Sequence, residues 1–559
     1  MAHPPHRFHL ILIKPTHYDD DGYPIQWRHN WIASNALACI YALALDCRDR
    51  AVLGPQTEII VHARDEICQR VPIKAFLRQI ANDDNRVLVC LVGVQSNQFP
   101  RAMDIATPFL AARLPVIVGG IHVSGCIAML KELPPDLREA RARGISLFAG
   151  EAEQGRFEQV VRDAYAGRLQ PVYDFLDNPP DIAGQPQPIL PSAILERSGW
   201  RSISIFDVGR GCPFVCSFCT IINVHGRKSR FRSPDDLEHI ILANQRLGIH
   251  QFFITDDNLA RNRNWEALFD RLIFLRERRA IPLRFQIQVD VRAHRVPGFI
   301  DKAVRAGVDQ VFMGVESVNP KNLTGAGKNQ NHVEEYREMM LAWKRHPVVI
   351  IGTYMIGFPN DTTESIRRDV EFLKHELPLD IVYFTLVQPL PGSRDHQRLA
   401  DQGAPMDMDM NKYDTTQPVT AHPLMTHEEL RAAYLDAWRR FYAFGHMATI
   451  FRRMFALGSN KKLTTANRLY WFSYFYPHMG IHPIDGGEYP IRKRRDRRPA
   501  LPRENPILFY PKNLLRVARH TITRHFYFHR VRGLMWRIYR DPATADYRDA
   551  AIVPEDTGR

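Results

Sequence analysis

The sequence predicts an α/β protein with three parts: a doubly wound, Rossmann- or flavodoxin-like domain, a partial (β/α)6 barrel of the TIM type, and a mainly helical C-terminal region. Two stretches, residues 1–175 and 201–400, alternate short apolar runs with helical patterns, which favours parallel sheets covered by helices. Between them, prolines punctuate residues 176–200, which predicts an extended linker. Residues 401–559 instead carry amphipathic helical patterns, of which 427–446 is the clearest.

The first stretch contains the elements of a doubly wound sheet. Its strands are expected at residues 8–14, 58–63, 86–93, 115–119 and 145–149, and its helices include 34–45 and 154–164. Ligands of such sheets bind at the carboxyl ends of the strands. Two of those ends carry glycine motifs, Gly119-Gly120-Ile121-His122-Val123-Ser124 and Gly150-Glu151-Ala152-Glu153. Paired glycines let the backbone approach a flat ligand closely, so we expect a ligand at this edge.

The second stretch contains six strand-like runs in the order that a partial barrel requires. They are residues 202–208, 251–255, 284–289, 310–313, 348–355 and 381–387. Each run ends in polar residues or in glycine and proline, and in α/β barrels the chemistry lies at the carboxyl ends of the strands. We therefore expect an active site formed by the loops that follow these strands.

Three cysteines follow the first of these strands. Cys212, Cys216 and Cys219 have C-x₃-C-x₂-C spacing, and Phe218 precedes the last of them. An ordinary iron–sulfur cluster takes four cysteines, so three thiolates leave one iron free to bind another ligand. The alternative is a structural zinc site, for which His225 would supply the fourth ligand. The remaining cysteines are scattered and are expected to be buried in a reducing compartment: Cys39, Cys47, Cys68, Cys90 and Cys126.

The cysteine motif resembles that of the radical S-adenosylmethionine (SAM) superfamily. In that family the cysteines hold a 4Fe–4S cluster whose open iron binds SAM, and one electron cleaves SAM to methionine and a 5′-deoxyadenosyl radical. The strand ends Asp256-Asp257, Gly314-Val315-Glu316-Ser317 and residues 352–359 also resemble segments of the family. The resemblance implies SAM contacts, without naming a catalytic residue, from Phe218, Asp256, Asp257, Gln288, Glu316, Ser317, Gly352 and Gly357.

The glycine motifs, placed ahead of the cysteines, resemble the cobalamin-binding domain that precedes many radical SAM domains. The resemblance implies cobalamin contacts from His17, Gln95, Ser96, Gly119, Gly120, His122, Ser124, Gly150 and Glu151. The Asp-x-His-x-x-Gly signature, whose histidine binds cobalt from below in other cobalamin proteins, is absent. His17 and His122 stay open as lower ligands, and so does a cobalt without one. An empty flavodoxin-like module is the alternative.

These resemblances imply a cobalamin-dependent radical SAM enzyme, and the first hypothesis is a methyltransferase that acts on an unactivated carbon. The second is an oxidative cyclase or rearrangement enzyme, since the anaerobic magnesium-protoporphyrin monomethyl ester cyclase has the same domain order. The third, from another class, is a zinc-knuckle protein that binds nucleic acid. The expected partners are a small-molecule, natural-product or lipid-like substrate and an electron donor such as flavodoxin or ferredoxin.

Composition bears on location. The net charge is +13, and 45% of the residues are hydrophobic, as in a globular protein with a large core. No secretory signal is evident, and the apolar stretch 31–45 is shorter than the ~20 residues that span a bilayer, so we expect a cytoplasmic protein.

The C-terminal region has a basic run at 491–498 and mixed aromatic and basic residues at 520–540. We interpret it as a helical cap over the barrel rather than a nucleic-acid surface, and peripheral membrane contact also fits.

Overall fold

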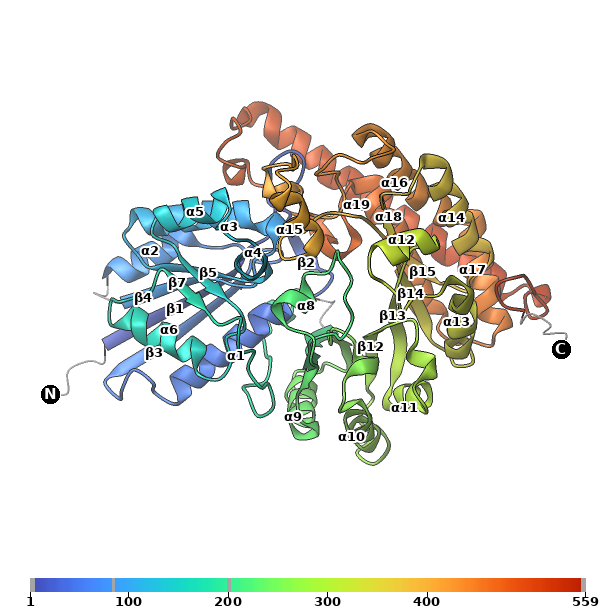
Figure 1. The fold of residues 1–559 in the computed structure, drawn as a ribbon, viewed down its shortest axis with the longest axis horizontal. Coiled ribbons are helices and arrows are strands. Elements are labelled where there is room, and N and C mark those ends of the chain that lie inside the picture. The colour runs from blue at the N-terminus through green and yellow to red at the C-terminus, as the bar shows by residue number, and fades with distance from the viewer. Residues whose placement is uncertain (1–5, 83–85, 199–202, 554–559) are drawn as a thin grey trace.

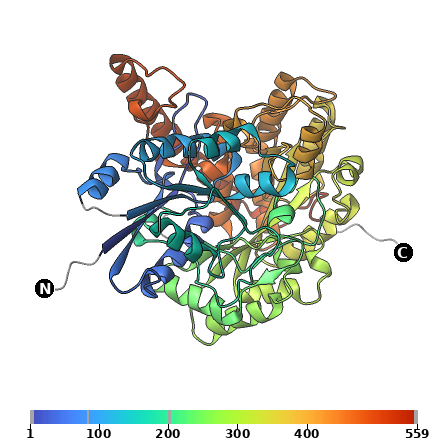
Figure 2. The same ribbon diagram turned by 60° about the vertical axis from the view of Figure 1, so that its left-hand side comes forward.

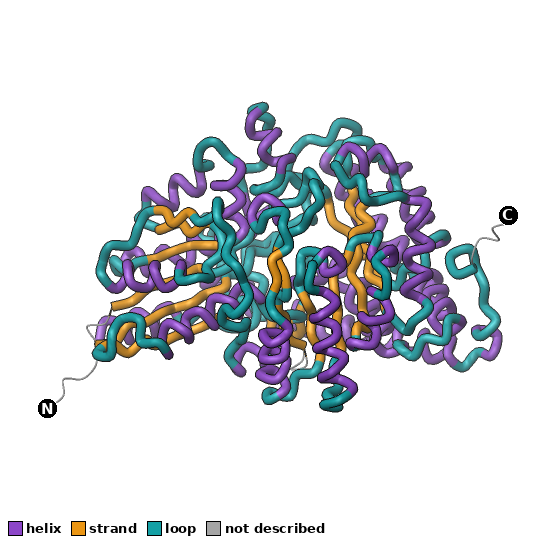
Figure 3. Tube along the Cα trace, turned by 60° about the horizontal axis from the view of Figure 1, so that its bottom comes forward, coloured by secondary structure: helices purple, strands orange, loops and turns teal. Residues whose placement is uncertain are grey.

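A computed structural model describes residues 6–82, 86–198 and 203–553 of the chain (Figure 1). It contains two parallel six-stranded sheets, and Figure 3 shows their strands as two separate groups flanked by helices. The C-terminal helices pack beside the second sheet (Figure 1). The predicted fold class, a doubly wound domain, a partial barrel and a helical C-terminal region, is confirmed.

The first sheet has the parallel strand order β3-β1-β4-β5-β6-β7, which is that of flavodoxin-like folds. Residues 8–13 of β1 are all buried, as a central strand covered on both faces requires. Helices α1 and α6 cover one face, and α2, α3 and α5 lie on the other (Figure 1). The elements are β1 His6–Lys14, α1 Asn35–Asp49, β3 Thr57–Asp65, α2 Ile73–Asn82, β4 Arg86–Leu91, α3 Phe99–Ala111, β5 Val116–Gly119, α4 Ile121–Met129, α5 Pro135–Ala142, β6 Ser146–Ala149, α6 Arg156–Tyr165 and β7 Val172–Asp174.

The second sheet has six parallel strands in sequence order, β8-β11-β12-β13-β14-β15, and curls into a partial barrel. Gln286 and Gln288 lie on the same side of β12, as predicted, and both face the lumen. The strands are β8 Ile203–Phe206, β11 Gln251–Ile254, β12 Arg284–Val289, β13 Val308–Glu316, β14 Val349–Ile356 and β15 Ile381–Leu386. The helices are α8 Ile221–Val224, α9 Pro234–Gln245, α10 Trp265–Glu277, α11 Phe299–Ala306, α12 Pro320–Gly325, α13 Tyr336–Lys344, α14 Thr363–His375 and α15 Arg394–Asp401.

Four helices form the C-terminal region: α16 His427–Phe441, α17 Phe444–Ala456, α18 Lys462–Met479 and α19 Pro506–Tyr539. The single helix predicted over 427–446 is two helices, because the backbone of Ala443 is extended and starts a new helix. The aromatic run 469–475 is wholly buried within α18, and the side chains of Arg468 and Phe472 line the barrel lumen. The C-terminal helices therefore cap the barrel, as expected.

Several small elements were not predicted. β7 has three residues, and β9 (Gly209–Arg210) pairs with β10 (Arg230–Phe231). A further pair, β2 (Trp27–Asn30) and β16 (Gly487–Pro490), joins the first domain to the C-terminal region. Within the predicted linker, Ile182 is fully buried and Ser192–Leu195 form the short helix α7, so that segment packs against the domains. None of the helices in the described ranges is long and apolar enough to cross a bilayer.

Candidate functional site

The cysteine motif lies in the loop between β9 and α8, at the carboxyl end of the first barrel strand. Cys216 is buried, and Cys212 and Cys219 are half-buried. Burial raises the pKa of the Cys219 thiol to about 12, and backbone N–H groups of Ile222 and Ile221 oppose that rise. A thiol in such surroundings becomes a thiolate when a metal offsets its charge. The first turn of α8 thus supplies hydrogen-bond donors to a sulfur ligand.

A buried lysine lies beside the motif. Lys328 Nζ is 2.8 Å from Glu316 Oε1 and 5.7 Å from the centroid of the Phe218 ring. The charge of Lys328 also interacts with Cys216 and Cys219, and Gln330 Nε2 lies 3.7 Å from the Cys216 sulfur. A cluster held by three thiolates is negatively charged, so a nearby cation and amide donor stabilise it. The residues around the motif therefore fit a 4Fe–4S cluster.

The same geometry argues against a zinc site. Among the described residues, no group of three or more His, Cys, Asp or Glu is placed to hold a metal ion. His225, the expected fourth zinc ligand, lies with its Nδ1 3.1 Å from Asp257. Zinc needs its ligand atoms around one point, whereas the cysteines of a cluster bind different irons. The residue expected as the fourth zinc ligand is therefore paired with a carboxylate instead.

Two of the expected SAM contacts lie against the cysteine loop. The Asp257 carboxylate accepts a hydrogen bond of 2.6 Å from the backbone N–H of Gly211. Glu316, at the end of β13, has a left-handed φ of 62° and accepts a 2.8 Å hydrogen bond from Thr353 Oγ1. That backbone turns the Glu316 side chain toward Lys328 and the lumen. Asp257 thus follows β11 and Glu316 ends β13, the strands on either side of β12.

The other expected SAM contacts are placed differently. Gln288 lines the lumen, and Gly357 lies in the turn after β14 with a φ of 96°. Asp256 is buried and accepts a 2.6 Å hydrogen bond from Asn262, and burial raises its pKa to about 7. Ser317 Oγ accepts a hydrogen bond from the backbone N–H of residue 319. Gly352 packs against Leu379, on the side of β14 that faces the helices, so it does not reach the lumen.

A cavity of about 230 Å³ lies at the carboxyl edge of the first sheet. Glycines from three strand ends line it, and its apolar walls come mainly from α1, α6 and the sheet. A side chain at Gly120, where φ is 144°, would place its Cβ 2.1 Å from the Val94 nitrogen. The predicted residues that line this cavity are Gly119, Gly120, Gly150 and Glu151, and residues Arg210 and His225 from the barrel complete it.

The remaining predicted cobalamin contacts do not line this cavity. His122 is buried, with Nδ1 3.0 Å from Ser96 Oγ and Nε2 2.8 Å from Asp136. Because both ring nitrogens have protein partners, His122 supports the loops from behind. Ser124 Oγ accepts a hydrogen bond from the Gly150 N–H and acts similarly. Gln95 is exposed, and His17 lies in another cavity with its Nε2 3.5 Å from Asp485.

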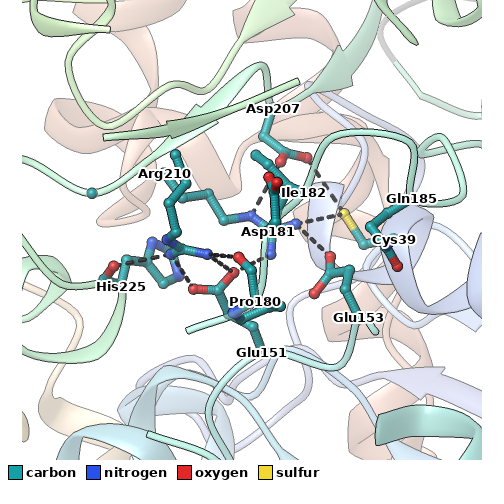
Figure 4. A network of polar contacts seen from close by, with 12 residues as sticks. Cys39, Glu151, Glu153, Pro180, Asp181, Ile182, Gln185, Asp207, Arg210 and His225 are labelled. Atoms are coloured by element: carbon teal, nitrogen blue, oxygen red, sulfur yellow. Dashed lines mark hydrogen bonds and ion pairs between the residues drawn. The ribbon is translucent and has the colours of Figure 1, made fainter. Parts of the chain in front are cut away.

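A buried ionic network joins the glycine motif to the cysteine loop (Figure 4). Arg210, two residues before Cys212, lies 2.6 Å from Glu151, 2.7 Å from Glu153 and 3.1 Å from Asp207. Arg230 forms a second pair with Glu151. Although burial opposes ionisation, these arginines lower the pKa of Glu151 to about 2. Glu151 therefore forms ion pairs with two arginines and also lines the cavity.

The lumen of the barrel encloses a cavity of about 300 Å³. Its walls carry aromatic and amide side chains, including Gln288, together with the Arg284–Asp309 ion pair, and Arg468 of α18 closes one end. Arg468 donates hydrogen bonds of 2.7 Å to Gln310 and 2.9 Å to Gln286, and its guanidinium lies 4.5 Å from the Trp31 ring centroid. Burial lowers the pKa of Arg468 to about 10. This cation thus faces the cavity with neutral hydrogen-bond partners.

Comparison with known sequences decides the family. The model of the Radical SAM superfamily matches residues 206–373, which carry the cysteine motif and the four barrel strands β11 to β14. These residues form a radical SAM domain. Such a domain implies a 4Fe–4S cluster and SAM, and it makes the chain an enzyme rather than a zinc-knuckle protein.

Individual relatives of this radical SAM enzyme include two curated proteins. Bacteriochlorophyllide d C-8(2)-methyltransferase from Chlorobaculum tepidum is 27% identical over 62% of this chain and 77% of its own length. The anaerobic magnesium-protoporphyrin IX monomethyl ester cyclase from Cereibacter sphaeroides is 26% identical over 49% of this chain and 45% of its own. Among solved structures, the cobalamin-dependent SAM radical enzyme OxsB matches with a TM-score of 0.56 at 12% identity, over 97% of this chain and 82% of that one. The fold is thus shared over almost the whole chain.

The sequence patterns did not identify three charged residues of this radical SAM enzyme: Arg210, Lys328 and Arg468. Arg210 could have been found, because it stands just before the Gly211-Cys212 start of the motif. Lys328 lies in a loop without a recognisable pattern, and it reaches Glu316 across 12 residues. Arg468 had no local signal, because its partners Gln286 and Gln310 are on barrel strands far away in the sequence.

We expect Arg210→Gln to lower the free energy of unfolding by about 3–5 kcal/mol, because it leaves buried carboxylates without their main cation. Arg162→Gln is the matched control, since Arg162 pairs with Glu158 on the surface of α6. Its loss should lower the free energy of unfolding by less than about 1 kcal/mol. Urea unfolding of both variants measures the difference. Equal effects of the two substitutions would contradict a structural role of the network.

Proposed function

We propose that the chain is a cobalamin-dependent radical SAM methyltransferase that acts on an unactivated carbon of a small molecule in the cytoplasm. The observation that carries the proposal is the composition of the glycine-lined cavity. Its walls come from the first sheet, but Arg210 and His225 of the cysteine loop complete it. A cofactor in that cavity would therefore lie beside the cluster loop. The similarity to a bacteriochlorophyllide methyltransferase and to the fold of OxsB supports the same conclusion.

Each part of the chain has a defined task in this proposal. Cys212, Cys216 and Cys219 hold the cluster, and Lys328 offsets its negative charge. Glu316 and Asp257 are placed to meet the polar groups of SAM, because their carboxylates lie at strand ends next to the cysteine loop. When bound, the cluster with SAM supplies a carbon-centred radical and cobalamin supplies a methyl group. A flavodoxin or ferredoxin would provide the electron.

The glycine-lined cavity would take the aromatic base of the cobalamin's nucleotide tail. Gly119, Gly120 and Gly150 keep the backbone close to the ligand, and the apolar residues of α1 and α6 surround it. His122 would not bind the cobalt, because both of its ring nitrogens are already occupied. We therefore propose that His122 would hold the loops around the cofactor in place.

An oxidative cyclase is the second candidate, because an anaerobic cyclase is among the similar proteins. Both candidates use the same cluster and SAM residues. The mass of the product separates them, since methyl transfer adds one methylene and oxidation adds oxygen or removes hydrogen. The first outcome is the one we expect.

We expect Cys216→Ala to abolish cluster binding and SAM cleavage. Protein reconstituted anaerobically with iron and sulfide should carry about four irons per chain, and the variant should carry far fewer because one thiolate is lost. Cys47→Ala is the matched control, since Cys47 is buried in the first domain away from the motif. Iron analysis and the release of 5′-deoxyadenosine after reduction report the result. SAM cleavage by the Cys216 variant at the wild-type rate would refute the assignment.

We expect Ile40→Trp to weaken binding of hydroxocobalamin by about tenfold or more, because Ile40 lines the glycine cavity and an indole would fill it. Tyr41→Trp on the same helix is the control, since Tyr41 does not line the cavity. Titration of the corrin absorbance measures both affinities. Unchanged affinity in Ile40→Trp would place the cobalamin elsewhere.

The lumen cavity is the proposed substrate site. Its aromatic walls suit a flat or apolar body, and Arg468 suits a carboxylate or phosphate on that body. Among the described residues Arg468 has no carboxylate in salt-bridge contact, whereas neighbouring Arg284 is paired with Asp309 at 2.6 Å. A buried guanidinium whose hydrogen-bond partners are neutral is strongly stabilised when an anionic ligand pairs with its charge. We therefore propose an anionic, largely apolar substrate, in the range of natural products and lipid-like molecules.

We expect the wild-type chain to bind 1-naphthoate more tightly than neutral 1-naphthamide, by about tenfold, because only the anion pairs with Arg468. Arg468→Gln should remove this preference, and Arg468→Lys should keep part of it. Arg271→Gln, at a surface ion pair, is the control. Quenching of tryptophan fluorescence, to which Trp31 in the cavity wall contributes, measures binding. An unchanged preference in Arg468→Gln would refute the anion site.

A further inference from the structure

The N-terminal half of α19 carries an apolar surface that the proposed function does not use. Seven large hydrophobic side chains between residues 507 and 526 are 63–78% exposed: Ile507, Leu508, Tyr510, Leu514, Leu515, Ile522 and Phe526. The C-terminal half differs, since Val531, Met535 and Ile538 are buried against neighbouring helices. Figures 1 and 2 show the N-terminal half projecting beyond the rest of the molecule.

Six of these side chains, all except Tyr510, form one continuous stripe together with Pro511 and Ala518. Exposed apolar residues recur three to four positions apart along the helix, which places them on one face. The apolar stripe consists of Ile507, Leu508, Pro511, Leu514, Leu515, Ala518, Ile522 and Phe526, and all eight are exposed. No charged residue interrupts it. Such a face on an otherwise well-packed chain indicates a surface that binds something apolar.

The charges of α19 identify the kind of partner. The helix contains no aspartate or glutamate and has seven cationic residues: Lys512, Arg516, Arg519, Arg524, Arg530, Arg532 and Arg537. With 3.6 residues per turn, Lys512, Arg519 and Arg530 fall along one side of the apolar stripe, and all three are exposed. An apolar face with a basic flank is the pattern of helices that lie in the interface of an anionic membrane.

Two other occupants fit less well. A second copy of the chain would bring two equally basic helices together, and like charges oppose that pairing. Nucleic acid would match the arginines, but the stripe is mainly aliphatic and offers no row of rings for base stacking. A helix with seven cations is also unsuited to span a bilayer, in line with the absence of a membrane-crossing helix among the described residues.

We propose that the apolar stripe of α19 docks the enzyme on the surface of an anionic phospholipid bilayer. Arg519 of the basic flank also lines a third cavity, of about 440 Å³, together with Arg516, His17 and Asp485. Docking would therefore bring the mouth of that cavity close to the lipid surface. The proposal rests on α19 alone and holds whether or not the chain is a methyltransferase.

The test is flotation of the purified full chain with vesicles of phosphatidylcholine, with and without about one-third phosphatidylglycerol. We expect flotation with the anionic vesicles and its loss in high salt. Leu514→Asp/Ile522→Asp should reduce the bound fraction by about tenfold or more, and Lys512→Glu/Arg519→Glu should also reduce it. Met408→Asp/Leu424→Asp is the matched control, because these residues are 71% and 57% exposed elsewhere on the surface.

Folding of the variants is checked by their melting temperature, which we expect to be unchanged because all substituted side chains are solvent-exposed. The proposal is overturned if the wild-type chain does not float, or if the stripe variant floats as well as the control. It is also overturned if ultracentrifugation shows a dimer that the stripe variant disrupts while no vesicles bind, since the occupant would then be a second copy.

Discussion

The relative position of the two sheets depends on the buried ion pairs that the Arg210 guanidinium forms. Arg210 belongs to β9, just before the cysteine loop, and it is held by Glu151 and Glu153 from the edge of the first sheet. Buried charges require their partners, so this network holds only when the two sheets are docked. Close backbone contact reinforces it, because a side chain at Gly125 of α4 would meet the turn at Gly392. The glycine cavity and the cysteine loop are thereby fixed beside each other.

This arrangement brings the two proposed cofactor sites together without a shared ligand. The first sheet provides an apolar, glycine-lined cavity, and the barrel provides thiols and strand-end carboxylates. Because the pKa of Glu151 is about 2, this carboxylate stays ionised across the physiological range. Its contribution to stability is present above the ordinary glutamate pKa and is lost only as the pH falls toward 2. The link between the sites is therefore insensitive to pH under working conditions.

The longer strands of the two main sheets, the cysteine motif and the glycine loops were predictable, because alternating apolar runs and short motifs are local signals. The break between α16 and α17 was not, since it depends on the extended backbone of one residue, Ala443. The pairing of β2 with β16 joins segments more than 450 residues apart and has no local signature. Glu151 was expected to meet cobalamin, but the sequence could not reveal that Arg210 and Arg230 hold it. Arg468 was missed for the same reason, because distant strands create its surroundings.

The most direct test of the central claim is the metal content of the wild-type chain purified without oxygen from cells supplied with cobalamin. A cobalamin-dependent radical SAM enzyme should contain about four irons and one cobalt per chain, with little zinc. Iron without cobalt, under conditions in which the corrin is abundant, would contradict the role proposed for the glycine cavity. Zinc in place of iron would contradict the account of the cysteine motif as a whole.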